Sequence, residues 1–120
     1  MPIVYRIEDE SGLGPYWNGP GYCATHGSSE TDDTRHPAPC DDGLDPYFGG
    51  VLFGFTSMEK LRAWFDTSVR SRLYRRGYKC AVYEVADIDI GESGKQCTFR
   101  RDEGHRISWG RKKFECVKAR

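Results

Sequence analysis

The spacing of apolar residues changes along the chain, and each spacing predicts a different kind of element. Residues 3–8 are rich in β-branched and aromatic side chains, which predicts a first strand. Over residues 57–76 the apolar side chains recur at the spacing of one helix face. Thr56 and Glu59 fit a capping box at the start of this segment, and Gly77 supplies its end. The pattern therefore predicts one amphipathic helix over 57–76.

Further strands are predicted on both sides of this helix. Residues 51–55 form a short apolar run that predicts a buried strand or turn, and residues 78–85 alternate in the manner of a strand. Three shorter strands are expected over residues 96–100, 106–109 and 113–117. The order of these elements predicts an α+β fold in which a small, mostly antiparallel sheet packs on the one main helix.

A long connection separates the first strand from the rest. Residues 9–50 show no periodic pattern and hold five of the six prolines. A loop-dominated stretch of this length inside a compact domain is more often functional than a plain connection. At 120 residues the chain is expected to form a single domain, 1–120, that includes this Gly/Pro-rich region.

The formal net charge is zero, but the charges are unevenly distributed. Residues 1–50 carry two basic and nine acidic side chains, whereas residues 51–120 carry sixteen basic and nine acidic ones. Basic residues that share a face could meet an acidic protein or a nucleic acid. The neutral total and the lack of a nucleic-acid-binding motif argue against a nucleic acid as the direct ligand.

Membrane insertion and secretion are not expected. No apolar run approaches the length of a membrane span, and residues 1–3 lack the basic and then apolar start of a secretory signal. The five cysteines are odd in number and irregularly spaced, which indicates free thiols rather than a disulfide framework. We therefore expect a cytoplasmic protein.

The outward face of the predicted helix collects cations, namely Lys60, Arg62, Arg70, Arg72, Arg75 and Arg76. Most of them lie in its C-terminal half, where the helix dipole favours positive charge. Two interpretations stand: a face that is merely solvated, or a surface on which the arginines bind a partner.

Arg6 is the only Lys or Arg in the first 34 residues, and it lies inside a predicted strand. The turn-rich segment 12–16 follows it, so its guanidinium is well placed to hold a phosphate or carboxylate. The alternative is a solvated charge at the edge of a sheet, because alternation puts Arg6 on the face opposite to Tyr5 and Ile7.

Cysteine and histidine form one candidate metal site. Two short pairs are separated by nine residues, and their members are Cys23, His26, His36 and Cys40. Zinc takes four such ligands in a tetrahedron and would also order the loop, so a structural zinc is one hypothesis; otherwise we expect no cofactor. No signature of a nucleophile surrounds any cysteine, and Cys80, Cys97 and Cys116 are expected to be small buried side chains.

Three short segments, taken in chain order, resemble the ADP-ribosyltransferase fold: Tyr5-Arg6, residues 53–57 and residues 96–99. The resemblance implies that Arg6 touches the phosphates of NAD or ADP-ribose with Tyr5 beside it, and that Thr56 and Ser57 order the nicotinamide ribose pocket. Gln96 would stand where the family has its catalytic acid. A neutral amide stabilises an oxocarbenium-like transition state poorly, so this departure puts transferase activity in doubt.

A second resemblance is carried by a set of motifs: Tyr-Arg-Ile-Glu, Gly-Leu-Gly-Pro-Tyr, His-Pro-Ala-Pro with Asp-Asp-Gly, Phe-Gly-Phe-Thr-Ser before Leu-Arg-Ala-Trp-Phe, and Lys-Gln-Cys-Thr-Phe. With these motifs the chain resembles small proteins encoded by phages and prophages. The resemblance implies an accessory protein in the host cytoplasm that binds a host protein or ribonucleoprotein complex, such as a CRISPR effector, and inhibits or modulates it. The alternatives are an ADP-ribosyltransferase-like enzyme or NAD-binding protein, and a zinc-stabilised binding module.

Overall fold

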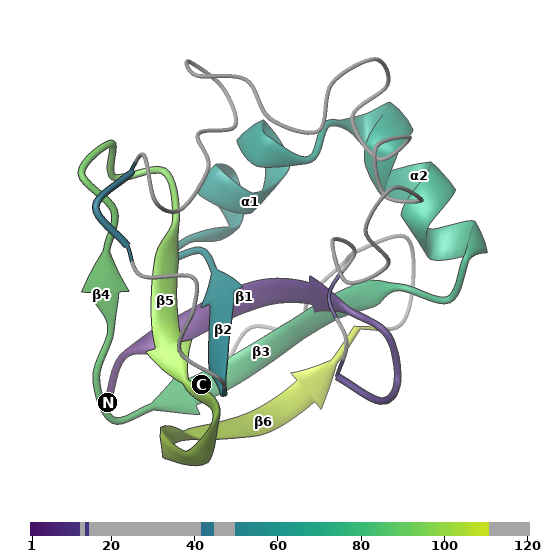
Figure 1. Cartoon of the computed structure of the whole chain (residues 1–120). Coiled ribbons are helices and arrows are strands. Elements are labelled where there is room, and N and C mark those ends of the chain that lie inside the picture. The colour runs from purple at the N-terminus through teal and green to yellow at the C-terminus, as the bar shows by residue number, and fades with distance from the viewer. Residues whose placement is uncertain (13, 15–41, 45–49, 111–120) are drawn as a thin grey trace.

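The computed structural model describes residues 1–12, 14, 42–44 and 50–110, and Figure 1 shows how their helices and strands are arranged. Strand β1 (Ile3–Glu8) comes first and is followed by β2 (Val51–Gly54) and two helices. The remaining elements, in chain order, are α1 (Met58–Trp64), α2 (Thr67–Arg75), β3 (Lys79–Val85), β4 (Asp89–Ile90), β5 (Cys97–Arg100), a 3-10 turn (Arg101–Glu103) and β6 (Gly104–Trp109).

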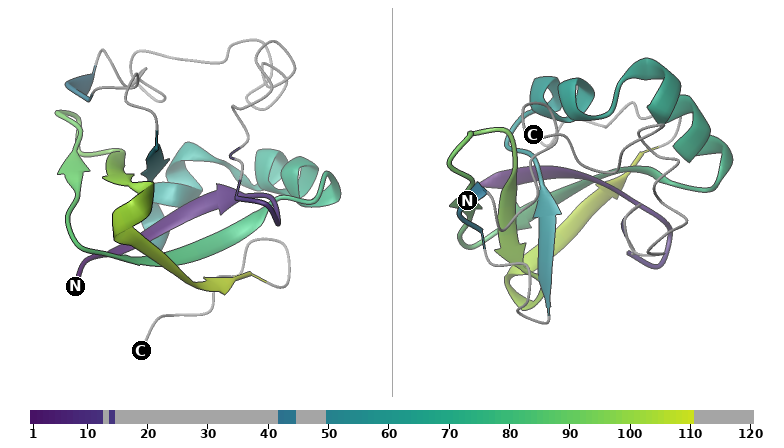
Figure 2. Two further views of the ribbon diagram at one scale, coloured as in Figure 1. Left: turned by 60° about the horizontal axis from the view of Figure 1, so that its bottom comes forward. Right: turned by 45° about the horizontal axis from the view of Figure 1, so that its top comes forward.

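The strands of the described residues form two antiparallel three-stranded sheets, one with the order β1-β3-β6 and the other with the order β2-β5-β4. Side chains alternate across the first sheet. Ile7 and Cys80 therefore pack against the helices, whereas Val4 and Tyr83 pack against Phe99 and its neighbours in the second sheet. The first sheet is the middle of three layers, with the helices on one face and the second sheet on the other (Figure 2).

The two sheets meet where β2 passes β1. Phe55 N donates to the Tyr5 carbonyl over 2.7 Å, and Tyr5 N donates to the Phe55 carbonyl over 2.8 Å. Gly54 makes this approach possible, because a Cβ atom there would lie 2.9 Å from the Tyr5 carbonyl oxygen and nearer still to the Val4 side chain. The crossing places the start of α1 beside β1.

The prediction of one continuous helix is wrong, because the segment divides into α1 and α2 at Phe65 and Asp66. Phe65 has extended backbone angles (φ −111°, ψ 102°), and the Asp66 carboxylate accepts the N–H of Val69 over 2.9 Å as the N-cap of α2. An aspartate followed by polar residues is a strong signal for a helix start. The apolar sides of both helices nevertheless share one core cluster, which contains Leu61, Trp64, Phe65, Val69 and Leu73.

The ends of the helical segment were predicted in part. The N-cap of α1 is Ser57, whose hydroxyl accepts the N–H of Lys60 over 3.2 Å, so the predicted Thr56 capping box is wrong by one residue. The end at Gly77 is confirmed. Gly77 has φ +92°, a conformation that glycine adopts easily, and its N–H donates to the Tyr74 carbonyl over 3.0 Å.

The predicted α+β class is confirmed, although two small sheets and two helices replace the single sheet and single helix. The strands predicted over 3–8, 51–55, 78–85, 96–100 and 106–109 are all present, with ends that differ by at most two residues. The strand predicted over 113–117 lies outside the described residues.

The described cysteines are buried, as predicted. Cys97 is a free thiol on β5, and burial raises its pKa to about 12. Cys80 on β3 is disulfide-bonded, so the prediction of free thiols is wrong at this position. Cys116 lies outside the described residues.

Candidate functional site

The side chain of Arg6 is buried in a polar cluster on the face of the first sheet that points toward β2. Because Arg6 and Glu8 are two residues apart on β1, they share the face that points toward the second sheet. Arg6 Nε donates to Glu8 Oε1 over 2.5 Å, and its two terminal nitrogens donate to the carbonyl oxygens of Phe53 (3.0 Å) and Gly12 (2.9 Å). The guanidinium therefore ties β1 to β2 and to the turn after β1.

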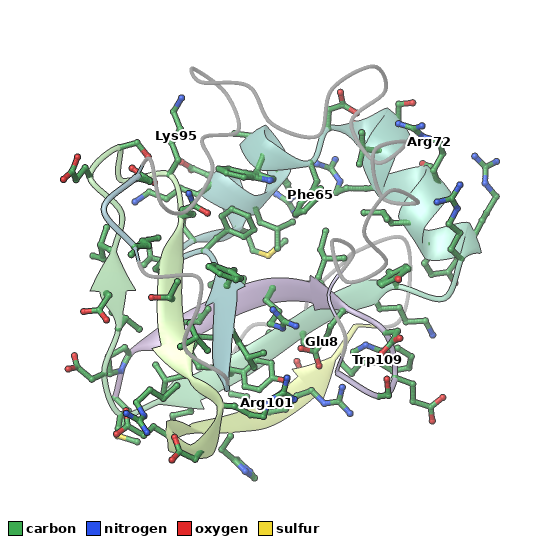
Figure 3. All side chains as sticks on the ribbon, in the orientation of Figure 1. Glu8, Phe65, Arg72, Lys95, Arg101 and Trp109 are labelled. Atoms are coloured by element: carbon green, nitrogen blue, oxygen red, sulfur yellow. The ribbon has the colours of Figure 1, made fainter. Side chains whose placement is uncertain are left out.

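Glu8 is the acceptor at the middle of this cluster and has no exposed surface. Its carboxylate accepts hydrogen bonds from Arg6, from the Tyr83 hydroxyl (2.8 and 2.9 Å) and from Arg106 (2.8 Å). The Trp109 indole N–H donates to the backbone oxygen of Glu8 over 3.2 Å, and Figure 3 shows Glu8 and Trp109 near each other. Through these bonds the Glu8 side chain joins β1 to β3 and β6.

The pKa of Tyr83 is raised by its surroundings in this cluster. Burial raises this pKa to about 12, and the neighbouring Glu8 carboxylate, which accepts a hydrogen bond from the hydroxyl, adds to the effect. The hydroxyl is therefore a donor to Glu8 rather than an acid poised to react near neutral pH.

The interpretation of Arg6 as a solvated edge charge is wrong, since only 5% of the residue is exposed. The structure instead gives Arg6 internal partners on three of its nitrogens. Glu8, Tyr83 and Arg106 were not singled out in the sequence. The signal that could have found Glu8 is its two-residue spacing from Arg6 on the first strand, whereas Tyr83 and Arg106 reach the cluster only through strand pairing.

Gln96 lies in a second buried polar cluster and does not face Arg6. Its amide nitrogen donates to Asp42 Oδ2 over 3.0 Å, and Ser93 donates to the same carboxylate through its N–H and its hydroxyl. Burial alone would raise the pKa of Asp42. The hydrogen bonds from Ser93 and Gln96 and the charge of Lys95 outweigh burial and hold that pKa below its ordinary value.

Thr56 and Ser57 also serve the local fold. Ser57 caps α1, and the Thr56 hydroxyl accepts from Lys60 Nζ over 3.2 Å. Tyr5 pairs through its backbone with Phe55, so it lies close to this corner. The backbones of β1, β2 and β5 thus converge near Gly54, but the side chains of Arg6, Ser57 and Gln96 bind different internal partners. Binding of NAD or ADP-ribose stays a prediction that these contacts do not favour.

The five arginines predicted to bind a partner divide into two groups. Arg70 donates to the carbonyl oxygens of Phe65 (2.7 Å), the C-cap of α1, and Arg62 (3.3 Å) in its last turn, and so satisfies acceptors that the helix end leaves open. Arg72 is half-buried, whereas the side chains of Arg62, Arg75 and Arg76 are exposed. Among these five arginines, the three exposed ones are the most accessible to a partner.

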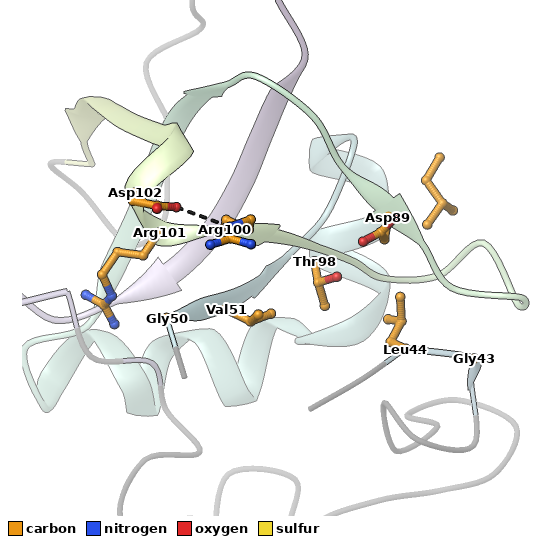
Figure 4. Close-up of a pocket in the computed structure, with 10 residues that line it drawn as sticks. Gly43, Leu44, Gly50, Val51, Asp89, Thr98, Arg100, Arg101 and Asp102 are labelled. Atoms are coloured by element: carbon orange, nitrogen blue, oxygen red, sulfur yellow. Dashed lines mark hydrogen bonds and ion pairs between the residues drawn. The ribbon is translucent and has the colours of Figure 1, made fainter. Parts of the chain in front are cut away.

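A hollow of about 790 Å³ lies over the outer face of the second sheet (Figure 4). Thr98 on β5 and Val51 on β2 line it, and the exposed Arg100 forms an ion pair of 3.4 Å with Asp102 at its rim. Thr98 is only 4% exposed. With Asp89 and Arg101 also present, the hollow carries charges of both signs.

The chain was compared with protein-family models, curated proteins and solved structures. The model of the bacteriophage T4 Y00F protein family matches residues 1–112. The chain belongs to this family. No curated protein and no solved structure matches it at a significant level. Membership of the Y00F family confirms the predicted resemblance to phage-encoded proteins, while the resemblance to ADP-ribosyltransferases finds no support.

Two further predictions concern metals and membranes. The candidate zinc ligands Cys23, His26, His36 and Cys40 lie outside the described residues, so that hypothesis stays a prediction. The residues that the structure does describe contain no group of three or more potential ligands that could hold a metal ion. None of the helices in this part of the chain is long and apolar enough to cross a membrane.

Proposed function

We propose that this Y00F-family protein is a phage accessory protein that binds a host protein or ribonucleoprotein complex and inhibits or modulates it by protein–protein contact. The observation that carries the proposal is the family match, which covers nearly the whole chain. A defence complex of the CRISPR type, in the host cytoplasm, is the target class that we propose.

The internal use of the polar side chains supports binding over nucleotide chemistry. Arg6, Glu8, Asp42 and Gln96 are all at most 5% exposed, and each is bonded to other parts of the chain. Buried and satisfied polar groups of this kind fix a fold but present no free donor to a ligand. The contacts available to a partner are therefore on the surface.

Exposed cations supply such a contact surface. Arg62 on α1 and Arg75 and Arg76 at the end of α2 extend into solvent from helices whose apolar sides are packed on the core. Arginine is enriched in protein interfaces because its fork can bind carboxylates with two hydrogen bonds. The helix pair thus offers rigidly supported charges to an acidic or polar host surface.

A phage-restriction assay tests the proposal. The protein is expressed in a host whose CRISPR system targets a second, unrelated phage, and plating of that phage is compared with plating on the same host without the system. We expect plating to rise at least tenfold only where the defence system is active, together with a complex of the protein and one defence component. Unchanged plating on hosts with and without several defence systems would refute this function.

A further inference from the structure

A group of cations and aromatic rings lies at the end of the molecule where α2, β3 and β6 meet. Lys79 Nζ lies over the ring of Trp109, 4.6 Å from its centroid, and 5.9 Å from the ring centroid of Tyr74. Arg106 Cζ lies 5.8 Å from the Trp109 ring centroid. β4 and β5 separate β6 from α2 and β3 in the sequence, so only the fold brings Arg106 and Trp109 beside Lys79 (Figure 1).

Arg76 extends this group beyond the end of α2. It is exposed, and as the C-cap of α2 it lies in the short turn that leads into Lys79 at the start of β3. We call Tyr74, Arg76, Lys79, Arg106 and Trp109 the basic–aromatic surface. Lys79 and Arg106 are held in place, because a cation over an aromatic ring loses part of its freedom before any partner arrives.

The acidic groups next to the surface do not cancel its charge. Glu8 is buried, and Arg6 shares it with Arg106, so one carboxylate faces two guanidinium groups. The side chain of Arg106 is still 33% exposed. Asp9 and Glu10 border the surface on the turn after β1, where the Glu10 backbone oxygen accepts from Arg106. The surface therefore keeps a positive charge with a defined acidic border.

We propose that the basic–aromatic surface binds an acidic, Asp/Glu-rich segment of the host partner. This inference rests on the proposed function and names the chemistry of the partner. Carboxylates match the charges of Arg76, Lys79 and Arg106, and neighbouring rings fix the last two in position. A single-stranded nucleic acid fits less well, because base stacking needs an open ring face and Lys79 covers the ring of Trp109.

A titration followed by ¹⁵N NMR tests the inference with a short poly-glutamate peptide as the probe. We expect the indole N–H signal of Trp109 and the amide signal of Lys79 to shift together, with weaker binding at higher salt. The double variant Arg76→Gln/Lys79→Gln should bind the peptide roughly fivefold or more weakly. The matched control Lys95→Gln/Arg100→Gln removes the same charge from exposed sites and should bind like the parent.

Three results would overturn the inference. One is the absence of shifts at Trp109 and Lys79 in the parent protein, and another is equal weakening by both double variants. The third is tighter binding of a single-stranded DNA or RNA oligonucleotide to the same surface. Thermal unfolding of each variant confirms that the fold is retained. The restriction assay uses no peptide, so the two tests are independent. If the protein raises plating in that assay but does not bind the peptide, the surface is refuted and the proposed function stands.

Discussion

The Nε atom of Arg6 lies 2.5 Å from Oε1 of Glu8, and the two side chains are only 6% and 0% exposed. An ion pair at this depth has given up its hydration, so each charge depends on the other and on further hydrogen bonds. Arg6 is therefore a structural residue whose guanidinium joins β1, β2 and the following turn.

Arg6→Ala tests this role. Removing one partner leaves Glu8 with fewer donors in a buried site, and we expect the free energy of unfolding to fall by about 3–5 kcal/mol. Urea denaturation followed by circular dichroism measures the change. The control is Arg62→Ala at an exposed position, which should cost less than about 0.5 kcal/mol. A loss below about 1 kcal/mol at Arg6 would contradict the structural role.

Tyr83→Phe tests the same cluster through its dependence on pH. The pKa of Tyr83 is raised from 10.0 to about 12 in the folded protein. A raised pKa means that the folded state holds the proton more tightly, so this stabilisation is complete below pH 10 and is lost as pH rises toward 12. Two pKa units correspond to about 2–3 kcal/mol.

Unfolding free energies measured from pH 8 to pH 12 should therefore fall more steeply for the parent than for Tyr83→Phe. The Cys97 thiol has a pKa raised to about 12 as well, but it is present in both proteins and cancels in the comparison. Parallel curves for the two proteins would contradict a raised pKa of Tyr83, and with it the burial of its hydroxyl beside Glu8.

The sequence was sufficient for the elements that depend on local pattern. The alternation in β1 and β3 and the glycine at position 77 were read correctly, because each signal lies within a few residues. The break at Asp66 was missed, although its capping preference was present in the sequence. The apolar spacing continues through both helices, because both pack on one core, and this spacing predicted a single helix in spite of the capping preference of Asp66.

The polar clusters could not be predicted in the same way. Arg106 lies 98 residues from Glu8 along the chain, and Asp42 lies 54 residues from Gln96. Such pairs follow from strand order and from the close approach at Gly54, which no local pattern contains. The charge of Arg6 was recognised as unusual, but its partners were available only from the fold.

Arg70→Ala addresses the junction of the two helices. The guanidinium donates to carbonyl oxygens at the end of α1, so its loss should reduce stability by about 1–2 kcal/mol. Arg76→Ala, at an exposed position on the same helix segment, is the matched control and should change stability by less than about 0.5 kcal/mol. Equal effects of the two changes on the thermal midpoint would exclude the bridging role of Arg70.

Ser108→Ala examines a polar atom that is buried on β6. Ser108 Oγ is buried and has no hydrogen-bond partner among the described residues, so this change removes a desolvated polar atom. We expect a gain in unfolding free energy of about 0.5–1.5 kcal/mol. Ser68→Ala, at an exposed site on α2, provides the comparison. A loss of stability at position 108 would mean that the hydroxyl has a partner in solution.

Co-purification from infected cells tests the central claim most directly. The tagged protein is isolated under native conditions from host bacteria during phage infection, and its mass is measured by size-exclusion chromatography with light scattering. The account predicts a complex of fixed stoichiometry with one host protein or ribonucleoprotein, and less of that complex with Arg76→Gln/Lys79→Gln than with Lys95→Gln/Arg100→Gln. Recovery of the protein only as a free chain, from several hosts and at several times after infection, would contradict it.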